Sequence, residues 1–357
     1  MKHDSFFKAD EFLYSHISGN GIYQLTGETV KDPLDGHYSE VGSSPLIKNV
    51  ITGEEFYIKL FEHNSYLLEQ YSKMITNPPC MNNILWPCDI IELNDALKGK
   101  CDLFVGQTYP EQSRESSCRY ALVFKNSTYP GLISGTDRFD KVRNLNWKDA
   151  EIKKLSHKIL AAIEKLNTSG YIYEDIHFSR FFFDENDDVF LNFSNLIFHV
   201  SDTAISDSHV CRANDNEYPI EFAEPAIVGK KQKTFDAQSQ NFSICSLLFY
   251  MFFNRLPYDG RLLSGYIDDS PQSHYIKFRD YHKMPVFIFD PDNAENALGL
   301  FDEEQFVVGL WNECPDEMKE TFISTLRREN AERTKCIDNL TPGQWITLLK
   351  SVGWINE

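Results

Sequence analysis

The hydrophobic and polar positions follow different periods in the first and later parts of the chain. Over residues 21–60, short apolar runs are separated by turn residues. Within residues 54–61 the side chains of Phe56, Ile58 and Leu60 fall on one face of an extended segment, as alternate positions of a strand do. This pattern predicts a first part of the chain built of β-strands.

A helical period begins after Asn146, which can cap a helix. Apolar residues then recur at spacings of three and four, and they form one stripe that ends near Gly170. The residues of the stripe are Ile152, Leu155, Ile159, Ile163 and Leu166. The later part of the chain is therefore predicted to be mainly helical.

Three further segments have helical character. Residues 65–74 precede the helix breakers at 77–79. Residues 242–253 are almost entirely apolar, and they predict a buried helix because they are too few to cross a bilayer. Near the end of the chain, Thr341 and Gln344 have the spacing of a capping box at the start of an amphipathic helix.

A β-hairpin is predicted between the helical stripe and the buried helix. The apolar run 181–183 is followed by the polar turn 184–188 and by a second apolar run, 189–191. Two polar residues flank the hairpin, Asp175 before its first strand and Asn192 after its second. These two are the first candidates for functional chemistry.

The composition of the 357 residues, 42% hydrophobic and 25% charged, is that of a globular protein long enough for two lobes. The net charge of −18 disfavours nonspecific binding to nucleic acid or to an anionic membrane, because both need a basic surface. The acidic surface either serves to bind a basic partner or simply keeps the protein in solution.

The eight cysteines are scattered, with no C-x-x-C pair and no histidine at ligand spacing, as expected for free thiols in a reducing cytosol. Acidic residues interrupt the first twelve positions, so export is not expected and a cytoplasmic location is. Asp290, Asp292 and Glu295 suggest calcium, but their spacing is not that of an EF-hand loop and is more typical of an Asx turn.

Residues 171–194 resemble the catalytic loop and the metal-binding loop of a protein kinase. Tyr173–Asp175 take the place of the H-R-D triplet, so that Asp175 occupies the position of the catalytic base. Arg180 takes the place of the catalytic-loop asparagine, and Asn192 takes that of the D-F-G aspartate. The resemblance therefore keeps the base position and changes both metal ligands.

A lysine in the predicted strands extends the resemblance. Residues 57–60, YIKL, resemble the V-A-I-K signature, in which the lysine contacts the nucleotide phosphates. The resemblance thus implies a phosphate-contacting role for Lys59. Its acidic partner would be Glu69 on the following helix, with Glu62 as the alternative.

Two further motifs resemble a bacterial kinase-like group that accompanies 2C-type phosphatases and von Willebrand A modules. They are the W-P-x-D segment 86–89 and the V-F-I-F-D-P turn 286–291. The L-P-Y-x-G turn 256–260, which follows the predicted buried helix, resembles the large lobe of kinases. Two positions depart from the kinase pattern. Glu224 precedes Pro225 in place of the order A-P-E, which displaces the glutamate that anchors to an arginine, and Gln240 replaces a buried aspartate while keeping its hydrogen-bonding capacity.

The resemblance implies an α+β fold of the bilobal protein kinase-like type. Residues 1–20 form a lead-in, residues 21–128 a small, mostly-β N-lobe, and residues 129–357 a larger, mostly-α C-lobe. Either residues 107–110 or residues 125–129 form the hinge.

The binding of nucleotide and metal expected from these residues is weak. The glycines Gly21, Gly27, Gly36 and Gly42 do not have the G-x-G-x-x-G spacing that lets backbone amides approach phosphates. An asparagine at position 192 is a poorer ligand for Mg²⁺ than a carboxylate, and Arg180 repels the ion. No metal and no cofactor are therefore expected, although ATP with Mg²⁺ would be used if the chain is active.

Two residues keep alternative roles. Asp175 either orients a substrate hydroxyl or hydrogen-bonds the amides of its own loop. Arg180 either holds a phosphate or acidic group directly or forms a salt bridge with Asp175 or Glu174.

The function expected from these motifs is that of a pseudokinase, a cytoplasmic protein-binding scaffold or regulator with little or no phosphoryl transfer. Its partner would be a protein, such as a 2C-type phosphatase or a von Willebrand A protein, and neither nucleic acid nor membrane. The alternatives are an atypical active kinase that uses Lys59 and Asp175, and a nucleotide sensor without turnover.

Overall fold

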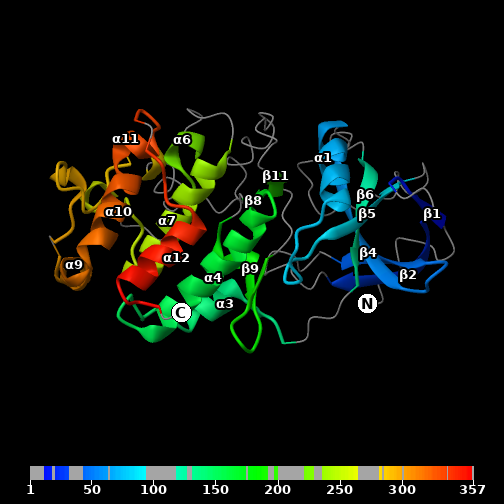
Figure 1. Cartoon of the computed structure of the whole chain (residues 1–357), viewed down its shortest axis with the longest axis horizontal. Coiled ribbons are helices and arrows are strands. Elements are labelled where there is room, and N and C mark those ends of the chain that lie inside the picture. Colours follow the sequence, from blue (N-terminus) through cyan, green and yellow to red (C-terminus); the bar gives the residue numbers. More distant parts are fainter. Residues whose placement is uncertain are drawn as a thin grey trace. The chain divides into compact units, whose positions relative to one another are not determined.

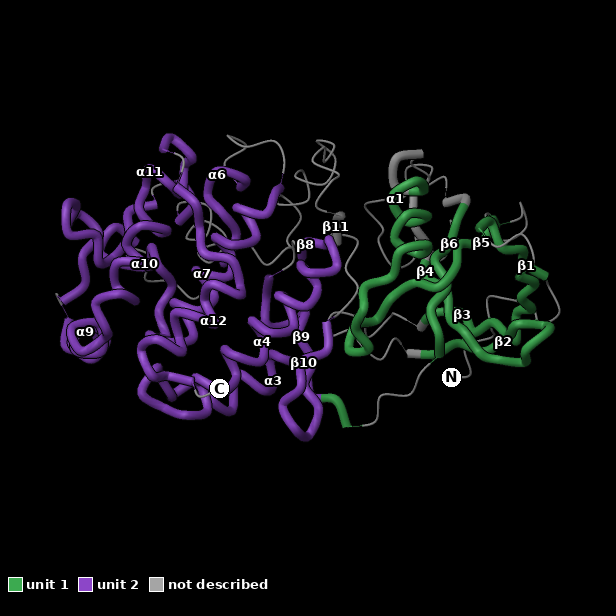
Figure 2. The backbone as a smooth tube through the Cα atoms, viewed as in Figure 1, with its two compact units in different colours: residues 1–132 green, residues 133–357 purple. Residues whose placement is uncertain are grey.

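The structure is a computed structural model of the whole chain, and it divides into two compact units, residues 1–132 and residues 133–357 (Figure 2). The sequence placed this division at 128/129. The described residues are 12–17, 21–31, 43–62, 65–93, 118–126, 131–173, 176–191, 197–199, 221–228, 235–263, 281–283, 285–299, 301–335 and 337–355.

Unit 1 is organised around an antiparallel β-barrel (Figure 1). Its described strands are β1 (Phe12–Ser15), β2 (Ile22–Lys31), β3 (Ser43–Asn49), β4 (Glu55–Glu62), β5 (Pro87–Glu92) and β6 (Cys118–Lys125). They pair in the order β1-β2-β3-β4-β6-β5, and β1 also pairs with β5, which closes the barrel. Helix α1 (Ser65–Thr76) lies between β4 and β5 in the chain and contacts β5.

Alternation along the strands fills the barrel. The buried side chains that pack together inside it are Leu13, Tyr23, Leu25, Ile47, Phe56, Ile58, Ile91, Leu93, Ala121 and Val123. On the opposite face of β4, Tyr57 is also buried and stacks on Phe124 of β6, with ring centroids 5.5 Å apart. Because β4 buries side chains on both faces, it is a central strand, as expected of a strand rich in aromatic and β-branched residues.

The fold class predicted from the sequence, a bilobal protein kinase-like α+β fold, is wrong. The strands of unit 1 close into a barrel, which is not the sheet of a kinase small lobe. The difference originates in residues 12–15, which the sequence assigned to a lead-in and which form β1. These residues pair with β2 on one side and with β5 on the other, so that the sheet has closed on itself.

The side chain of Asp89 on β5 links β5 to β1 and β2 where the barrel closes. Its carboxylate accepts hydrogen bonds from the hydroxyl of Ser15 on β1 (2.8 Å) and from that of Tyr23 on β2 (2.9 Å). The side chain is 4% exposed, and two donors compensate the desolvation that a buried carboxylate suffers. The negative charge and burial together raise the pKa of Tyr23, which stays protonated and remains a donor.

Unit 2 combines helices with short strands (Figure 1). The strands are β7 (Ile133–Ser134), β8 (Tyr171–Tyr173), β9 (Phe181–Phe183), β10 (Val189–Leu191) and β11 (Ile197–His199). The α-helices are α3 (Gly135–Asp140), α4 (Ala150–Thr168), α6 (Pro225–Val228), α7 (Ala237–Phe253), α9 (Asp302–Glu313), α10 (Asp316–Leu326), α11 (Arg328–Ala331) and α12 (Pro342–Ser351). The 3₁₀ helices are η2 (Phe178–Arg180), η4 (Arg261–Leu263) and η5 (Ala294–Asn296).

Helix α7 forms the centre of unit 2. Its residues from Ser239 to Phe253 are buried apart from Tyr250, and it contacts α4, α9 and α10. Aromatic rings fill these contacts, as where Phe249 meets Phe322 of α10 at 5.3 Å. The buried helix predicted at 242–253 is confirmed. No helix in the described part of the chain is both long and apolar enough to span a bilayer.

The hairpin predicted at 181–191 is also confirmed. Strands β9 and β10 pair antiparallel, with Phe183 opposite Val189. In the turn, the carboxylate of Asp184 accepts hydrogen bonds from the amides of Asn186 (2.9 Å) and Asp188 (2.8 Å). Asp187 adopts a positive φ of 60°, a conformation that aspartate tolerates better than most residues.

Candidate functional site

The site residues predicted from the sequence are distributed over both units. Asp175 and Asn192 lie outside the described residues, so their roles stay predictions. Lys59 lies on β4, with its Nζ atom 5.6 Å from the centre of the Phe124 ring. Glu69 lies on α1, where its carboxylate forms an ion pair with Lys73 on the next turn (3.1 Å). Arg180 ends η2 in unit 2.

The described residues nearest to Asp175 form a compact polar site. Strand β8 ends at Tyr173, and η2 begins after its cap, His177. The Nδ1 atom of His177 accepts a hydrogen bond from the amide of Ser179 (3.1 Å) and lies 2.8 Å from its hydroxyl. Because Nδ1 accepts this amide proton, a neutral His177 carries its own proton on Nε2.

The electrostatics of this loop favour the neutral imidazole. Burial of the ring lowers the pKa of His177 to about 4, and the positive charge of Arg180 contributes to the lowering. The Nε atom of Arg180 is itself buried. At neutral pH, Arg180 therefore supplies the positive charge of the loop, and His177 supplies a neutral N–H.

Glu221 adds a carboxylate from a distant part of the chain. Its Oε2 atom lies 3.9 Å from Nε2 of His177 and is buried, and burial raises the pKa of the carboxyl group. Among the described residues, Oε2 has no hydrogen-bond partner. We call His177, Ser179, Arg180 and Glu221 the His177 site.

Aromatic rings form the base of the His177 site. Phe178 stacks on Phe139 of α3 at 4.0 Å and meets Phe222 edge to face at 5.7 Å. Phe222 in turn lies 5.7 Å from Tyr250 of α7. These contacts hold η2 and residues 221–222 against the buried helix, so that the polar groups of the site keep their positions.

Gln240 of α7 holds the backbone at Tyr173, the last residue of β8 before the His177 site. Its Oε1 atom accepts hydrogen bonds from the backbone amide of Tyr173 (2.7 Å) and from the side chain of Asn167 (3.1 Å). Its Nε2 atom donates to the side-chain oxygen of Asn167 (2.9 Å). The expectation that Gln240 keeps the hydrogen bonding of an acidic residue without its charge is confirmed.

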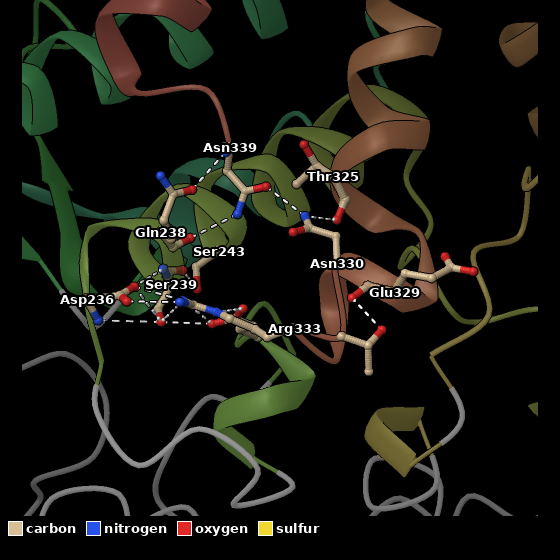
Figure 3. Close-up of polar contacts among 11 residues, drawn as sticks. Asp236, Gln238, Ser239, Ser243, Thr325, Glu329, Asn330, Arg333 and Asn339 are labelled. Atoms are coloured by element: carbon tan, nitrogen blue, oxygen red, sulfur yellow. Dashed lines mark hydrogen bonds and ion pairs between the residues drawn. The ribbon is translucent and has the colours of Figure 1, made fainter. Parts of the chain in front are cut away.

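A second polar cluster holds the segment that carries Glu221 (Figure 3). Arg333 forms a two-pronged ion pair with the buried Glu224, at 2.6 and 2.9 Å, and also binds Asp236 at 2.7 Å. The hydroxyl of Ser239 donates to Glu224 (2.8 Å). The sequence-based interpretation that Glu224 is displaced from an anchoring arginine is therefore wrong, since the A-E-P order still lets the glutamate reach Arg333. We call these four residues the Arg333 cluster.

The structure does not favour a divalent cation at the His177 site or at Asp290, Asp292 and Glu295. Arg180 places a fixed positive charge at the first, and like charges repel. At the second, Arg327 binds Asp292 (2.7 Å), and the amide of Asp292 donates to Asp290 in the expected Asx turn. In the described part of the chain, no three His, Cys, Asp or Glu side chains are grouped as a metal site would require.

Known proteins give no guide to the role of this site. The sequence matches no model of a known protein family, and a search among characterised proteins found no match. The functional interpretation therefore depends on the residues themselves.

Sequence reasoning selected Arg180 but missed His177 and Glu221. The one local signal was that His177 directly follows the loop of Asp175 and precedes a serine whose amide it can cap. Glu221 lies far along the chain in the mainly apolar stretch YPIEFA, residues 218–223, and only the fold brings its carboxylate to the imidazole.

Proposed function

We propose that the chain acts in the cytoplasm as a protein-binding scaffold or regulator with little or no phosphoryl transfer. This is the pseudokinase function expected from the motifs in residues 171–194. It concerns the chemistry of the His177 site and does not depend on the fold of unit 1.

One observation carries the proposal. Arg180 lies three residues after His177 at the end of η2, and after burial its positive charge is the second cause that lowers the pKa of His177. Phosphoryl transfer needs divalent cations to spread the charge that develops on the phosphates. A guanidinium cannot lose its proton and offers no lone pair, so it neither binds Mg²⁺ nor tolerates it nearby.

The same site is suited to binding. It combines a neutral N–H on His177, the carboxyl group of Glu221 and the cation of Arg180 on a base of aromatic rings. Oε2 of Glu221 and Nε of Arg180 are buried, so the partly exposed imidazole is the group that a partner reaches. Groups of this kind recognise polar side chains or backbone without reacting with them. Large apolar side chains are also exposed in both units, among them Ile51 (75% exposed) and Phe306 (62% exposed).

Thermal unfolding with ATP tests the catalytic part of the proposal. We expect no Mg²⁺-dependent or Mn²⁺-dependent shift for the natural chain. The matched variant Arg180→Asn restores the amide expected of a kinase at this position, so a shift that appears only in this variant would identify Arg180 as the obstacle. A metal-dependent shift of the natural chain, with labelled phosphate transfer that Asp175→Asn abolishes, would overturn the proposal.

A shift with ATP alone, independent of metal and without transfer, would identify a nucleotide sensor instead. The partner is tested by calorimetric titration with a purified 2C-type phosphatase domain and with a purified von Willebrand A module. Binding to either one supports the partner class expected from the sequence, and heat changes no larger than dilution with both would reject that class.

A further inference from the structure

We propose that the outer face of helix α9 is a docking surface for a basic amphipathic helix of a partner protein. This inference rests on the proposed protein-binding function and names the surface and the partner chemistry. Helix α9 lies at the margin of unit 2 in the view of Figure 2. The face is formed by Asp302, Phe306, Gly309 and Glu313, and we call these residues the α9 stripe.

The inner face of α9 fixes which residues point outward. Leu310 and Trp311 are buried, and Trp311 stacks on Phe289 with ring centroids 4.4 Å apart. The carboxylate of Glu304 is turned back to the helix start, where it accepts a hydrogen bond from the amide of Gly299 (2.8 Å). With these anchors in place, the residues of the α9 stripe, spaced three and four apart, share the opposite side of the helix.

The α9 stripe exposes a large aromatic side chain. Phe306 is 62% exposed, and Phe301, at the start of the helix, is 51% exposed. A single exposed apolar residue needs no explanation, but Phe301 and Phe306 are the two large apolar side chains that are exposed in the described part of unit 2. Phenylalanine is also one of the residues that provide binding energy at protein interfaces.

Gly309 gives a second, independent reason. It lies inside the helix, where glycine is less favourable than alanine because it loses more backbone freedom on folding. Its φ is not positive, and a Cβ built on it would meet nothing within 4 Å. In the described part of the chain, nothing therefore requires a glycine at position 309. A glycine on an exposed helix face does allow another backbone or a bulky side chain to come close, next to Phe306.

The charge of α9 selects the kind of partner. The helix, DEEQFVVGLWNE, contains no lysine or arginine, and two of its acidic residues, Asp302 and Glu313, belong to the α9 stripe. At one end of the stripe Glu313 is bound by Lys148, whereas at the other end Asp302 is exposed. In a chain of net charge −18, this face repels a second copy of itself and attracts a positively charged segment. A helix with one apolar and one basic side meets both the aromatic and the acidic parts of the stripe.

A labelled synthetic peptide tests this surface with the full chain. The probe is a helical peptide of leucine and lysine, and its control has glutamate at every lysine position. Fluorescence anisotropy in 150 mM and in 500 mM salt separates apolar from electrostatic binding. We expect the lysine peptide to bind and to keep measurable affinity at the higher salt, and we expect the glutamate peptide not to bind.

Three variants assign the binding to the α9 stripe. Phe306→Ser and Gly309→Leu should each weaken binding at least tenfold, although Gly309→Leu should unfold at a temperature no lower than that of the natural chain. Asp302→Lys should weaken the lysine peptide severalfold. The matched control Tyr14→Ser removes another exposed aromatic ring, from unit 1, and should leave binding unchanged.

The proposal would be overturned by equal binding of the two peptides, by binding that persists in Phe306→Ser and Gly309→Leu, or by no binding at all. Self-association of the natural chain in sedimentation, lost in Phe306→Ser, would also overturn it, because a second copy would then occupy the face. None of these results changes the outcome of the nucleotide titrations, so a failure here is distinct from a failure of the proposed lack of phosphoryl transfer.

Discussion

Glu221 and Glu224 belong to one short segment of unit 2, and they pair with their bases in different ways. In the Arg333 cluster, Glu224 is 1% exposed and receives two hydrogen bonds from a guanidinium that is always charged. In the His177 site, Glu221 lies 3.9 Å from an imidazole that is neutral at pH 7. Burial raises the pKa of both carboxyl groups.

This comparison separates a structural acid from a candidate functional one. Glu224 and its partners form hydrogen bonds and ion pairs with one another. The cluster therefore holds α6, α7 and the residues after α11 together. The Oε2 atom of Glu221 has no hydrogen-bond partner among the described residues. A buried acceptor of this kind has a cost in free energy, which persists because the site is used or because the surrounding structure enforces it.

The largest effect is expected from breaking the Arg333 cluster. Arg333→Met leaves Glu224 buried and unpaired, and loss of one partner of a buried ion pair costs about 3–5 kcal/mol in the free energy of unfolding. Urea unfolding followed by tryptophan fluorescence measures this loss. The matched control is Lys125→Met, because Lys125 binds Glu54 with both side chains exposed and its loss should cost less than about 1 kcal/mol. Equal losses for the two variants would contradict the contrast between buried and exposed pairs.

An intermediate effect is expected from the pH dependence of His177. The folded-state pKa of about 4 lies below the unfolded value of 6.5, so the unfolded chain binds more protons between these pH values. Stability is therefore lost as the pH falls from 6.5 to 4, by about 2–3 kcal/mol from this residue alone. His177→Asn keeps an acceptor for the amide of Ser179 and cannot titrate.

Unfolding of the natural chain and of His177→Asn between pH 7 and pH 4 measures that contribution as the difference between the two curves, in which all other groups cancel. The natural chain should lose more stability than the variant over this interval. If the two curves were parallel, the pKa of His177 would be the same in the folded and the unfolded chain, and burial would not hinder protonation of the imidazole.

The smallest effect is expected from Glu221. Its folded-state pKa is raised, so the folded chain holds a proton more readily than the unfolded chain, and stability falls as the pH rises through that range. Glu221→Gln removes this penalty and should raise the free energy of unfolding at pH 7 by about 1 kcal/mol. The same substitution at Glu224 should lower it, because it removes charge from a satisfied pair. A loss at both positions would mean that Glu221 is also structural.

Local patterns were sufficient to predict several elements of the fold. The alternation of Phe56, Ile58 and Leu60, the apolar stripe of α4, the turn of the β9–β10 hairpin and the apolar run of α7 all correspond to described elements. In each of them, one repeat of apolar positions or one turn residue within a short stretch of sequence is enough to predict the element. The chemistry of the hairpin turn follows from aspartates alone, since Asp184 caps the turn with its own side chain.

Contacts between distant residues could not be predicted in this way. Strand β1 has only four residues, too few to show a period, and its closure of the barrel depends on β5 and Asp89. Likewise the His177 site depends on a carboxylate from residue 221, and the ion pair of Glu224 depends on Arg333, 109 positions away. In each case the decisive interaction joins residues that are far apart in the sequence, so no local pattern near either residue predicts it.

The closure of the barrel by its first strand also has a consequence for synthesis. The ribosome releases β1 early, but the hydroxyl of Ser15 meets the carboxylate of Asp89 only after 74 further positions have been translated. Until β5 has left the ribosome, the nascent sheet has an edge strand without its partner, and this strand can pair with other chains. A slow codon run or a chaperone acting in that interval would therefore influence the yield of folded protein more than its final stability.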